Sequence, residues 1–349
     1  MYNSAWPIPL HLAVFALSGL LVAVVGVRLA DYAARIARRT GLGQAVTGAL
    51  FLGASTSLSG IITSVTAAAG GHPELAASNA VGGIAAQTVF LVIADRVYRK
   101  ANLEHAAASD ENMLQGALLI ALLAGTLLAA FSPEFTLLGV HPVSLLIPVA
   151  YGLGQRMVYT AKGQEMWQPR VTEQTQLEER AEAPTPAGSD SDPMILLWGR
   201  FAVAALVIAV FGYTLARSGV AIAEITGMSQ TVLGGIFTAI STSFPELVTA
   251  IAAVKLGALT LVVSDIVGGN AFDVIFLAVA DVAYREGSLY HAMGDRSTFL
   301  ITVTILLTSV LLLGLIRREK HGIANIGFES VLVLLIYGGG FLIIVTAMG

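Results

Sequence analysis

Two acidic residues lie inside stretches of the chain that are otherwise apolar. Glu246 is in the middle of the range 228–255, and Asp273 is in the middle of the range 260–284. A carboxylate at the centre of a bilayer costs roughly 2.5–3.5 kcal/mol on insertion scales, so each acid needs a compensating cation or a proton. No lysine or arginine lies at a matching depth in any apolar range of the chain. We therefore expect bound ions to supply the missing positive charge.

Hydroxyl and amide side chains accompany these two acids. Calcium in proteins takes roughly six to eight oxygen ligands from carboxylates, carbonyls, hydroxyls and amides. The candidate ligands for such a hard cation are two carboxylates, four hydroxyls and two amides: Glu246, Asp273, Thr242, Ser243, Thr56, Ser57, Gln87 and Asn270. Pro245 removes a backbone hydrogen bond beside Glu246, which is expected to kink that helix and to expose carbonyl oxygens.

Each of these candidates also has a purely structural interpretation. A serine or threonine in a membrane helix often donates only to the carbonyl four residues earlier. Gln87 could instead bridge two helices, and the pairs Gly82-Gly83 and Gly268-Gly269 could serve close helix packing rather than ligation. The two acids themselves could be protonated, hydrogen-bonded structural groups.

Composition assigns the chain to the integral membrane proteins. Of its 349 residues 56% are hydrophobic and 12% are charged, whereas soluble domains carry roughly 25% charged residues. Cysteine is absent and the six histidines show no zinc-binding spacing, so a thiolate metal site is excluded and a resident cofactor is not expected. No basic stripe supports nucleic-acid binding. The sequence also contains no nucleophile–base pattern, so we expect no enzyme activity.

The fold class predicted is an all-α polytopic membrane protein. Ten stretches are apolar over about the 17–25 residues that a spanning helix needs. They lie near 9–38, 43–70, 75–98, 113–131, 142–160, 195–218, 228–255, 260–284, 297–316 and 329–348. The domain prediction is a five-helix half over 1–160, a polar, Pro-containing linker over 161–193, and a second five-helix half over 194–349.

The distribution of basic residues predicts the orientation of these helices. With the N-terminus outside, sixteen of the 19 lysines and arginines fall on the inner side and three on the outer side. Such an excess marks the cytoplasmic side of a membrane protein. The linker 161–193 is therefore predicted to be cytoplasmic. The first apolar stretch lacks a basic region before it and is followed by arginines, so we interpret it as a helix and not as a signal peptide.

One segment of the chain is duplicated. Residues 41–100 and 227–286 align without a gap at a constant offset of 186 positions. The identical pairs include Gly48/Gly234, Phe51/Phe237, Ser78/Ser264, Gly82/Gly268, Gly83/Gly269, Asp95/Asp281 and Tyr98/Tyr284. Five helices per half, an odd number, predict that the second half enters the membrane upside down. Inverted repeats mark secondary transporters, with a substrate site near the midplane where the halves meet.

Two further aspartates end predicted helices within this repeat. Asp95 and Asp281 precede Arg99 and Arg285 by four residues. Oppositely charged side chains at this spacing are neighbours on a helix surface. We therefore expect two surface ion pairs here.

The second copy of the repeat carries a recognisable pattern. It has STSFPE over 241–246 and SDIVGGNAFD over 264–273. This resembles the α-repeat of the cation/calcium exchanger superfamily, which has G-T-S-x-P-E on one helix and G-N-x-x-G-S-N-x-x-N/D on the next. The chain thus resembles prokaryotic sodium/calcium exchangers. That resemblance implies ten helices in two inverted halves and a location in the prokaryotic inner membrane. The implied partners are inorganic cations and the lipid bilayer.

By the same resemblance, several residues match ion ligands of the family. Glu246 and Asp273 match its ligating acids, Thr242 and Ser243 its hydroxyl ligands, and Thr56 and Ser57 their counterparts in the first repeat. Gln87 lies where the family has an asparagine or aspartate ligand.

Both copies depart from the family pattern, the first more than the second. Gly60 replaces its glutamate, Ser59 replaces its proline, and Gly83 and Gly269 replace serines of the two copies. Asp265 replaces the asparagine of the second copy's G-N pair, and it could add a charge along the inner access path. We interpret Gly60 as an emptied ligand position facing the filled position of Glu246.

These observations together predict a secondary-active cation antiporter. The expected exchange is calcium against sodium or protons, by alternating access through a midplane site with two carboxylates. The alternative is a non-transporting ion sensor or structural membrane protein whose exchanger site has degenerated. A channel fits the inverted repeat less well.

Overall fold

The computed structural model describes residues 6–40, 53–98, 101–107, 109–161, 193–255, 257, 259–319 and 327–347. Apart from one isolated β-bridge, the secondary-structure elements of these residues are all helices, which confirms the all-α class. They are α1 (Ile8–Thr40), α2 (Gly53–Thr56), α3 (Leu58–Ala69), α4 (Pro73–Val97), α5 (Leu103–Ala106), α6 (Asp110–Phe131), α7 (Pro142–Ala161), α8 (Met194–Thr226), α9 (Gln230–Val232), η2 (Leu233–Thr238), α10 (Ala239–Lys255), α11 (Leu259–Asp273), α12 (Ile275–Ala283), α13 (Leu289–Ala292), α14 (Gly294–Arg317) and α15 (Phe328–Thr346).

Eight of the described helical stretches are long and apolar enough to cross a membrane. They correspond to eight of the ten predicted ranges. The range 43–70 is helical over α2 and α3, but its first part lies outside the described residues, and the range 142–160 is helical as α7. Neither range is among the eight, so the count of ten stays a prediction. The predicted linker 161–193 falls almost wholly outside the described residues.

The helices themselves recur at the offset of the sequence repeat. Helix α1 recurs as α8, with both ends displaced by 186 positions, and α5 recurs as α13 in the same way. Helix α4 recurs as the pair α11 and α12, which together start and end 186 positions later. The duplication therefore extends well beyond the 60 residues that align plainly in the sequence.

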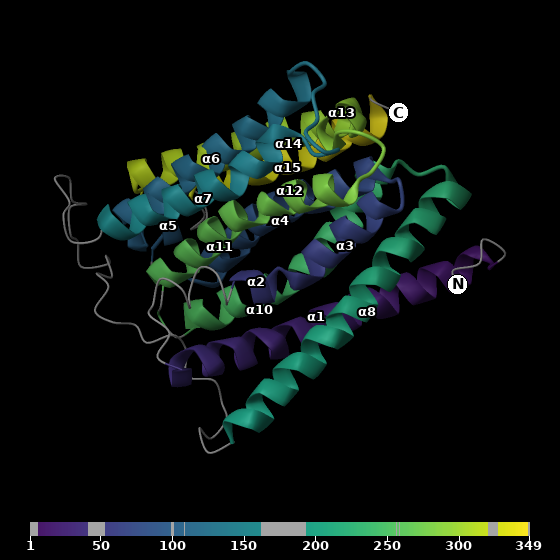
Figure 1. The fold of residues 1–349 in the computed structure, drawn as a ribbon. Helices are drawn as coiled ribbons and strands as arrows, with labels where there is room; N and C mark the ends of the chain where they lie inside the picture. The colour runs from purple at the N-terminus through teal and green to yellow at the C-terminus, as the bar shows by residue number, and fades with distance from the viewer. Residues whose placement is uncertain are drawn as a thin grey trace.

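Figure 1 shows three layers of helices. The long helices α1 and α8 form one outer layer. Helices α3, α4, α10, α11 and α12 lie in the middle, and α6, α7, α14 and α15 form the other outer layer. The middle layer is therefore screened from the surroundings on both of its sides.

The outer pair α1 and α8 runs antiparallel. The hydroxyls of Ser18 and Thr214 lie 2.8 Å apart, while Leu29, further along α1, packs with Ile208, earlier in α8. Each helix has 33 residues, or about 50 Å at the rise of an α-helix. This exceeds the roughly 30 Å of a bilayer core, so both helices must tilt or project from it.

Helix α4 is the centre of the fold. Of its most apolar window 89% is buried, and a helix that is buried all round needs small residues where its neighbours approach. Gly82 is such a residue, because a methyl group added to it would fall on the backbone of Gly235 in η2. The predicted close approach at Gly82 is thus confirmed.

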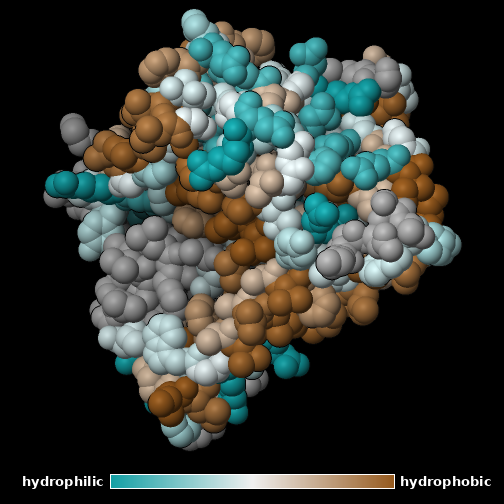
Figure 2. All heavy atoms as spheres, turned by 45° about the vertical axis from the view of Figure 1, so that its right-hand side comes forward, coloured by the Kyte–Doolittle hydropathy of each residue, from teal (hydrophilic) through white to brown (hydrophobic). Residues whose placement is uncertain are grey.

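Large apolar side chains cover the outward faces of the outer layers. On α7 and α8 the exposed ones include Leu145, Leu146, Val149, Leu153, Ile195, Val203 and Leu206. The face drawn in Figure 2 carries a broad hydrophobic surface, with hydrophilic side chains gathered at its upper part. Contiguous apolar surface of this kind suits lipid contact and not water.

Asp95 and Asp281 do not form the predicted surface ion pairs. Both are fully buried, and each accepts a hydrogen bond from the backbone N–H of the leucine eight residues later, Leu103 at 2.6 Å and Leu289 at 2.7 Å. One predicted arginine partner lies outside the described residues, and the other, Arg285, is exposed. The prediction was wrong because helical spacing does not reveal that the chain folds back over each helix end.

The contact at Gly82 gives a test of the packing of the middle layer. Replacing Gly82 by alanine should lower the melting temperature of the purified protein, since overpacking a core costs roughly 1–3 kcal/mol. Gly125→Ala on α6 is the matched control, because nothing lies within 4 Å of its added methyl. Equal melting temperatures for the two variants would contradict this packing.

Candidate cation site

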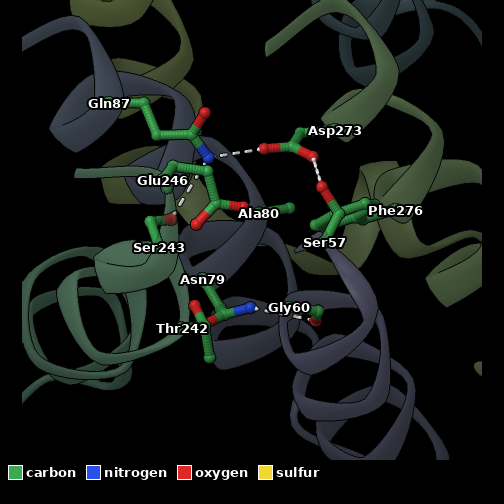
Figure 3. A pocket seen from close by; sticks show the side chains of 11 residues that line it. Ser57, Gly60, Asn79, Ala80, Gln87, Thr242, Ser243, Glu246, Asp273 and Phe276 are labelled. Atoms are coloured by element: carbon green, nitrogen blue, oxygen red, sulfur yellow. Dashed lines mark hydrogen bonds between the residues drawn. The ribbon is translucent and has the colours of Figure 1, made fainter. Parts of the chain in front are cut away.

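A small cavity lies where the repeat-related helices meet in the middle layer. Its volume is about 10 Å³, room for a single water-sized sphere. It is lined by Ser57, Gly60, Asn79, Ala80, Gly83, Gln87, Thr242, Ser243, Glu246, Asp273 and Phe276 (Figure 3). Six of the eight predicted ligands thus line one cavity, although they come from segments about 190 positions apart in the chain.

Asp273 is held by side chains of the first half. The Ser57 hydroxyl donates to Asp273 Oδ1 at 2.7 Å, and Gln87 Nε2 donates to Oδ2 at 2.8 Å. The same Gln87 nitrogen lies 3.3 Å from the Ser243 hydroxyl oxygen. The carboxylate is therefore oriented by two donors, and its charge is partly balanced without any basic group.

These contacts follow the internal symmetry of the chain. Gln87 and Asp273 occupy equivalent positions of the two repeats, as do Ser57 and Ser243. Ser57 of the first copy binds Asp273 of the second, while Ser243 of the second contacts Gln87 of the first. Equivalent positions of the two halves thus meet at the site, with an amide from one half next to a carboxylate from the other.

Glu246 has the less satisfied environment of the two acids. Its side chain is 8% exposed, and its Oε2 atom has no hydrogen-bond partner among the described residues. No lysine, arginine or histidine is among the described residues that line the cavity. A buried carboxylate oxygen without a partner is costly, so this atom has the chemistry of a ligand for a cation or of a proton acceptor.

The helix that carries Glu246 is irregular next to it. Residues 233–238 adopt the wide π-helical turn η2, and Pro245 lies inside the following helix α10. Such turns occur frequently at functional sites. The hydroxyl of Thr242 donates to the carbonyl of Ala239 at 3.2 Å. Thr242 therefore bonds to the backbone of its own helix, three residues back and not the four of the predicted alternative, while still lining the cavity.

Two predicted ligands do not line the cavity. The amide of Asn270 points to α4, where its Nδ2 lies 3.4 Å from both the Ile84 carbonyl oxygen and the Thr88 hydroxyl. Thr56 ends α2 and is half-buried outside the lining. The exposed Asp265 is not a lining residue either.

Asn79 lines the cavity but was not among the predicted ligands. Its Nδ2 donates to the Gly60 carbonyl at 3.2 Å and to the Ser64 hydroxyl at 2.9 Å. Its equivalent in the second repeat is Asp265. The repeat could have identified Asn79 as a candidate from the sequence, because the equivalent position of the second copy carries an acid.

Gly60 is not an empty ligand position. A Cβ atom added to it would lie 2.6 Å from the ring of Phe276, which also lines the cavity. The space that a longer side chain would need is thus filled by an aromatic ring of the second half. The interpretation of Gly60 as vacant was wrong because the loss of the acid is matched by packing that the sequence does not display.

This packing predicts that an acid cannot simply be restored. Gly60→Glu should lower the melting temperature, whereas the pair Gly60→Glu with Phe276→Ala should regain part of the loss because the ring is removed. Gly60→Ala separates the steric effect from the added charge. If Gly60→Glu alone melts as wild type does, Phe276 does not occupy the position.

Known proteins resemble this chain over most of its length. Putative antiporter CaxA of Alkalimonas amylolytica is 27% identical over 313 residues, covering 87% of this chain and 91% of that protein. Inner membrane protein YrbG of Escherichia coli (strain K12) is 25% identical over 260 residues, covering 74% and 75%.

Solved structures share the fold. The sodium-calcium exchanger NCX_Mj superposes with a TM-score of 0.59 at 18% identity, covering 97% of this chain and 99% of that chain. The H+/Ca2+ exchanger CAX superposes with a TM-score of 0.69 at 14% identity, covering 95% and 82%.

The family comparison repeats the division of the chain into halves. The sequence profile of the family described as "Sodium/calcium exchanger protein" matches residues 10–159 and again residues 196–346. The two matches together span most of the 349 residues and leave out the predicted linker. The chain therefore belongs to the sodium/calcium exchanger family, within the cation/calcium exchanger superfamily.

Proposed function

We propose that this protein is a secondary-active cation antiporter that exchanges calcium for sodium or protons. The observation that carries the proposal is the pair of buried acids, Glu246 and Asp273, which line one cavity with hydroxyl and amide oxygens and without a described basic side chain. Oxygen-rich sites of this kind suit hard cations. The ions are cargo and not a resident cofactor.

Relatives support the same class of function. Their printed names include a putative antiporter, a sodium-calcium exchanger and an H+/Ca2+ exchanger. The names of the two solved exchangers pair calcium with sodium in one and with H+ in the other. Both sodium and protons are therefore kept as candidates for this chain.

The proposed topology has ten spanning helices in two inverted halves. Support comes from the antiparallel contacts of α1 with α8 and from the recurrence of helix ends at the repeat offset. The basic residues favour an outside N-terminus and a cytoplasmic linker 161–193 in the inner membrane.

Alternating access would require α1 and α8 to slide across the middle layer. Gly26 of α1 lies against Pro245, the proline next to Glu246. Its repeat equivalent, Gly212 of α8, lies against the side chain of Ile62 and the carbonyl oxygen of Ser59. Both long helices thus contact the site helices through a glycine, which leaves no side chain to block a sliding motion.

The two acids limit the charge that the site can carry. They can neutralise one divalent ion, two sodium ions, or one sodium ion and one proton. Position 87 carries a glutamine and Phe276 occupies the place beside Gly60, so no further carboxylate lines the cavity among the described residues. We propose reduced or electroneutral coupling.

Transport by this site can be measured in proteoliposomes. Tracer calcium uptake should follow an imposed sodium or proton gradient, and Glu246→Gln should reduce it at least 10-fold because one of the two compensating charges is lost. Glu286→Gln, at an exposed position, is the matched control and should transport as wild type does.

The alternative, a degenerate ion sensor or structural protein, is favoured by one observation, the Phe276 ring packed over Gly60. It predicts uptake that ignores both gradients and the Glu246→Gln change. Melting curves in a panel of cations separate the two alternatives further. A sensor shows an ion-dependent shift without transport, whereas a structural protein shows neither.

The sliding motion has its own test at Gly26. Gly26→Ala places a methyl group 2.5 Å from Pro245, so exchange should slow several-fold while the cation-dependent rise in melting temperature is retained. Gly199→Ala on α8 is the control, since nothing lies within 4 Å of its added methyl. Unchanged exchange by Gly26→Ala would contradict sliding at this contact.

A further inference from the structure

The two repeats build the same structure around Asp281 and around Asp95, at opposite ends of the molecule, beside α13 and α5 (Figure 1). Asp281 accepts hydrogen bonds from the backbone N–H of Leu289 at 2.7 Å, the Ser144 hydroxyl at 2.7 Å and the backbone N–H of His141 at 2.8 Å. Three donors thus satisfy this buried carboxylate without a basic side chain.

Asp95 has the three equivalent donors, each displaced by 186 positions. They are the backbone N–H groups of Leu103 and Gly327 and the hydroxyl of Ser330. A carboxylate that accepts several hydrogen bonds is stabilised in its charged form. The shared scaffold therefore supplies hydrogen-bond donors to one buried carboxyl group at each end of the molecule.

The end at Asp95 carries two more carboxylates. Glu104 occupies the position of Tyr290, and Glu329 occupies the position of Val143. Glu104 interacts with both Asp95 and Glu329, and it is hydrogen-bonded to Glu329. Three acids thus meet where the other repeat has one acid, a phenol and an apolar residue.

Two glycines provide the space for Glu329. A side chain on Gly314 would meet the Cβ, Cγ and Cδ atoms of Glu329 at 2.5–3.0 Å, and a side chain on Gly327 would fall on its Oε1 atom. The equivalents of these glycines in the other repeat are Leu128 and His141. The extra acids and the room they need therefore occur together at one end of the molecule.

The added acids are buried and incompletely satisfied. Glu104 is 2% exposed and Glu329 is 3% exposed. Glu104 Oε2 and Glu329 Oε1 have no hydrogen-bond partner among the described residues. Two neighbouring carboxyl groups can form a hydrogen bond only if one of them is protonated. Neighbouring buried carboxylates disfavour each other's charged form.

Burial and neighbouring negative charges both act on Glu104. Burial raises the pKa of Glu104 well above its ordinary value, and the charges of Asp95 and Glu329 raise it further. The neighbouring elements bring these ionisable side chains to this end of the molecule: His105 on α5, Arg96 and Tyr98 at the end of α4, Asp265 on α11, and Arg317, Arg318 and Glu319 at the end of α14. Of these, His105 and Arg318 bind each other's backbone carbonyls, at 2.8 and 3.1 Å.

We propose that Asp95, Glu104 and Glu329 form a proton-binding site, separate from the cation cavity, at the predicted cytoplasmic ends of α4 and α15. Asp95 is the carboxyl group held by the shared scaffold, and Glu104 and Glu329 share the bound proton. A shared proton is the ligand that the hydrogen bond between Glu104 and Glu329 requires.

The bound proton joins three elements. It holds the short helix α5 and the first turn of α15 against the end of α4. Its loss would place like charges together in a buried site and separate these helix ends. Because this end of the molecule is predicted to face the cytoplasm, the site would make the packing of the core responsive to internal pH.

The test is the pH dependence of melting for the full-length protein in detergent. A raised pKa in the folded state gives stability that is present at low pH and is lost as pH rises through that pKa. Loss of one proton predicts a fall of about 2–4 °C per pH unit between the ordinary pKa of a glutamate and the raised pKa of the folded state. Glu104→Gln and Glu329→Gln should each flatten this slope, and Tyr290→Phe in the other repeat should leave it unchanged.

Infrared spectroscopy gives a second readout, which would not change if Glu104 had only a structural role. The C=O stretch of a protonated carboxyl group should be present at neutral pH in a Glu246→Gln background and should weaken when Glu104→Gln is added. Slopes and spectra that match between Glu104→Gln and its parent would overturn the proposal. So would a rise in melting temperature with calcium at pH 8 that requires Glu104 but not Glu246, since this would indicate a divalent-cation site.

Discussion

The cost of burying Glu246 and Asp273 is the constraint on which the rest of the structure depends. Two carboxylates in a medium of low dielectric need positive charge or protons, and no described basic side chain lines their cavity. The protein meets part of this need with neutral donors, since Ser57 and Gln87 orient Asp273. Glu246 retains an unpartnered oxygen. A cation in the cavity would satisfy both acids, whereas a basic side chain would neutralise them permanently.

Internal duplication explains how one chain builds such a site. Gln87 and Asp273 are the same position of the repeat, and they are hydrogen-bonded to each other where the two halves meet. Each half alone supplies only part of the site. The functional differences between the halves therefore arise from single replacements on a shared scaffold, such as Phe276 packed over Gly60 at the cavity and Glu104 at the position of Tyr290 near a helix end.

The sequence predicted the all-helical class and six residues that share the cavity, because acids within apolar stretches and an ungapped repeat can be recognised from the sequence alone. It did not predict the packing between the halves. Asn270 carries a ligand-like amide, yet it bonds α4 and not the cavity. Asp95 and Asp281 suggested ion pairs by spacing, but the chain turns back and buries them. In each case the deciding contact joins residues far apart in the sequence or lies beyond a turn that periodicity does not describe.

The most direct test of the account is to locate the ion. Crystals of the protein should be soaked in strontium, a heavier substitute for calcium, and anomalous scattering should be measured at the cavity. The account predicts one peak between the carboxylates of Glu246 and Asp273, and its loss in Glu246→Gln crystals. A cavity without a peak at saturating strontium, in crystals where both carboxylates are ordered, would contradict the claim that a cation compensates these acids.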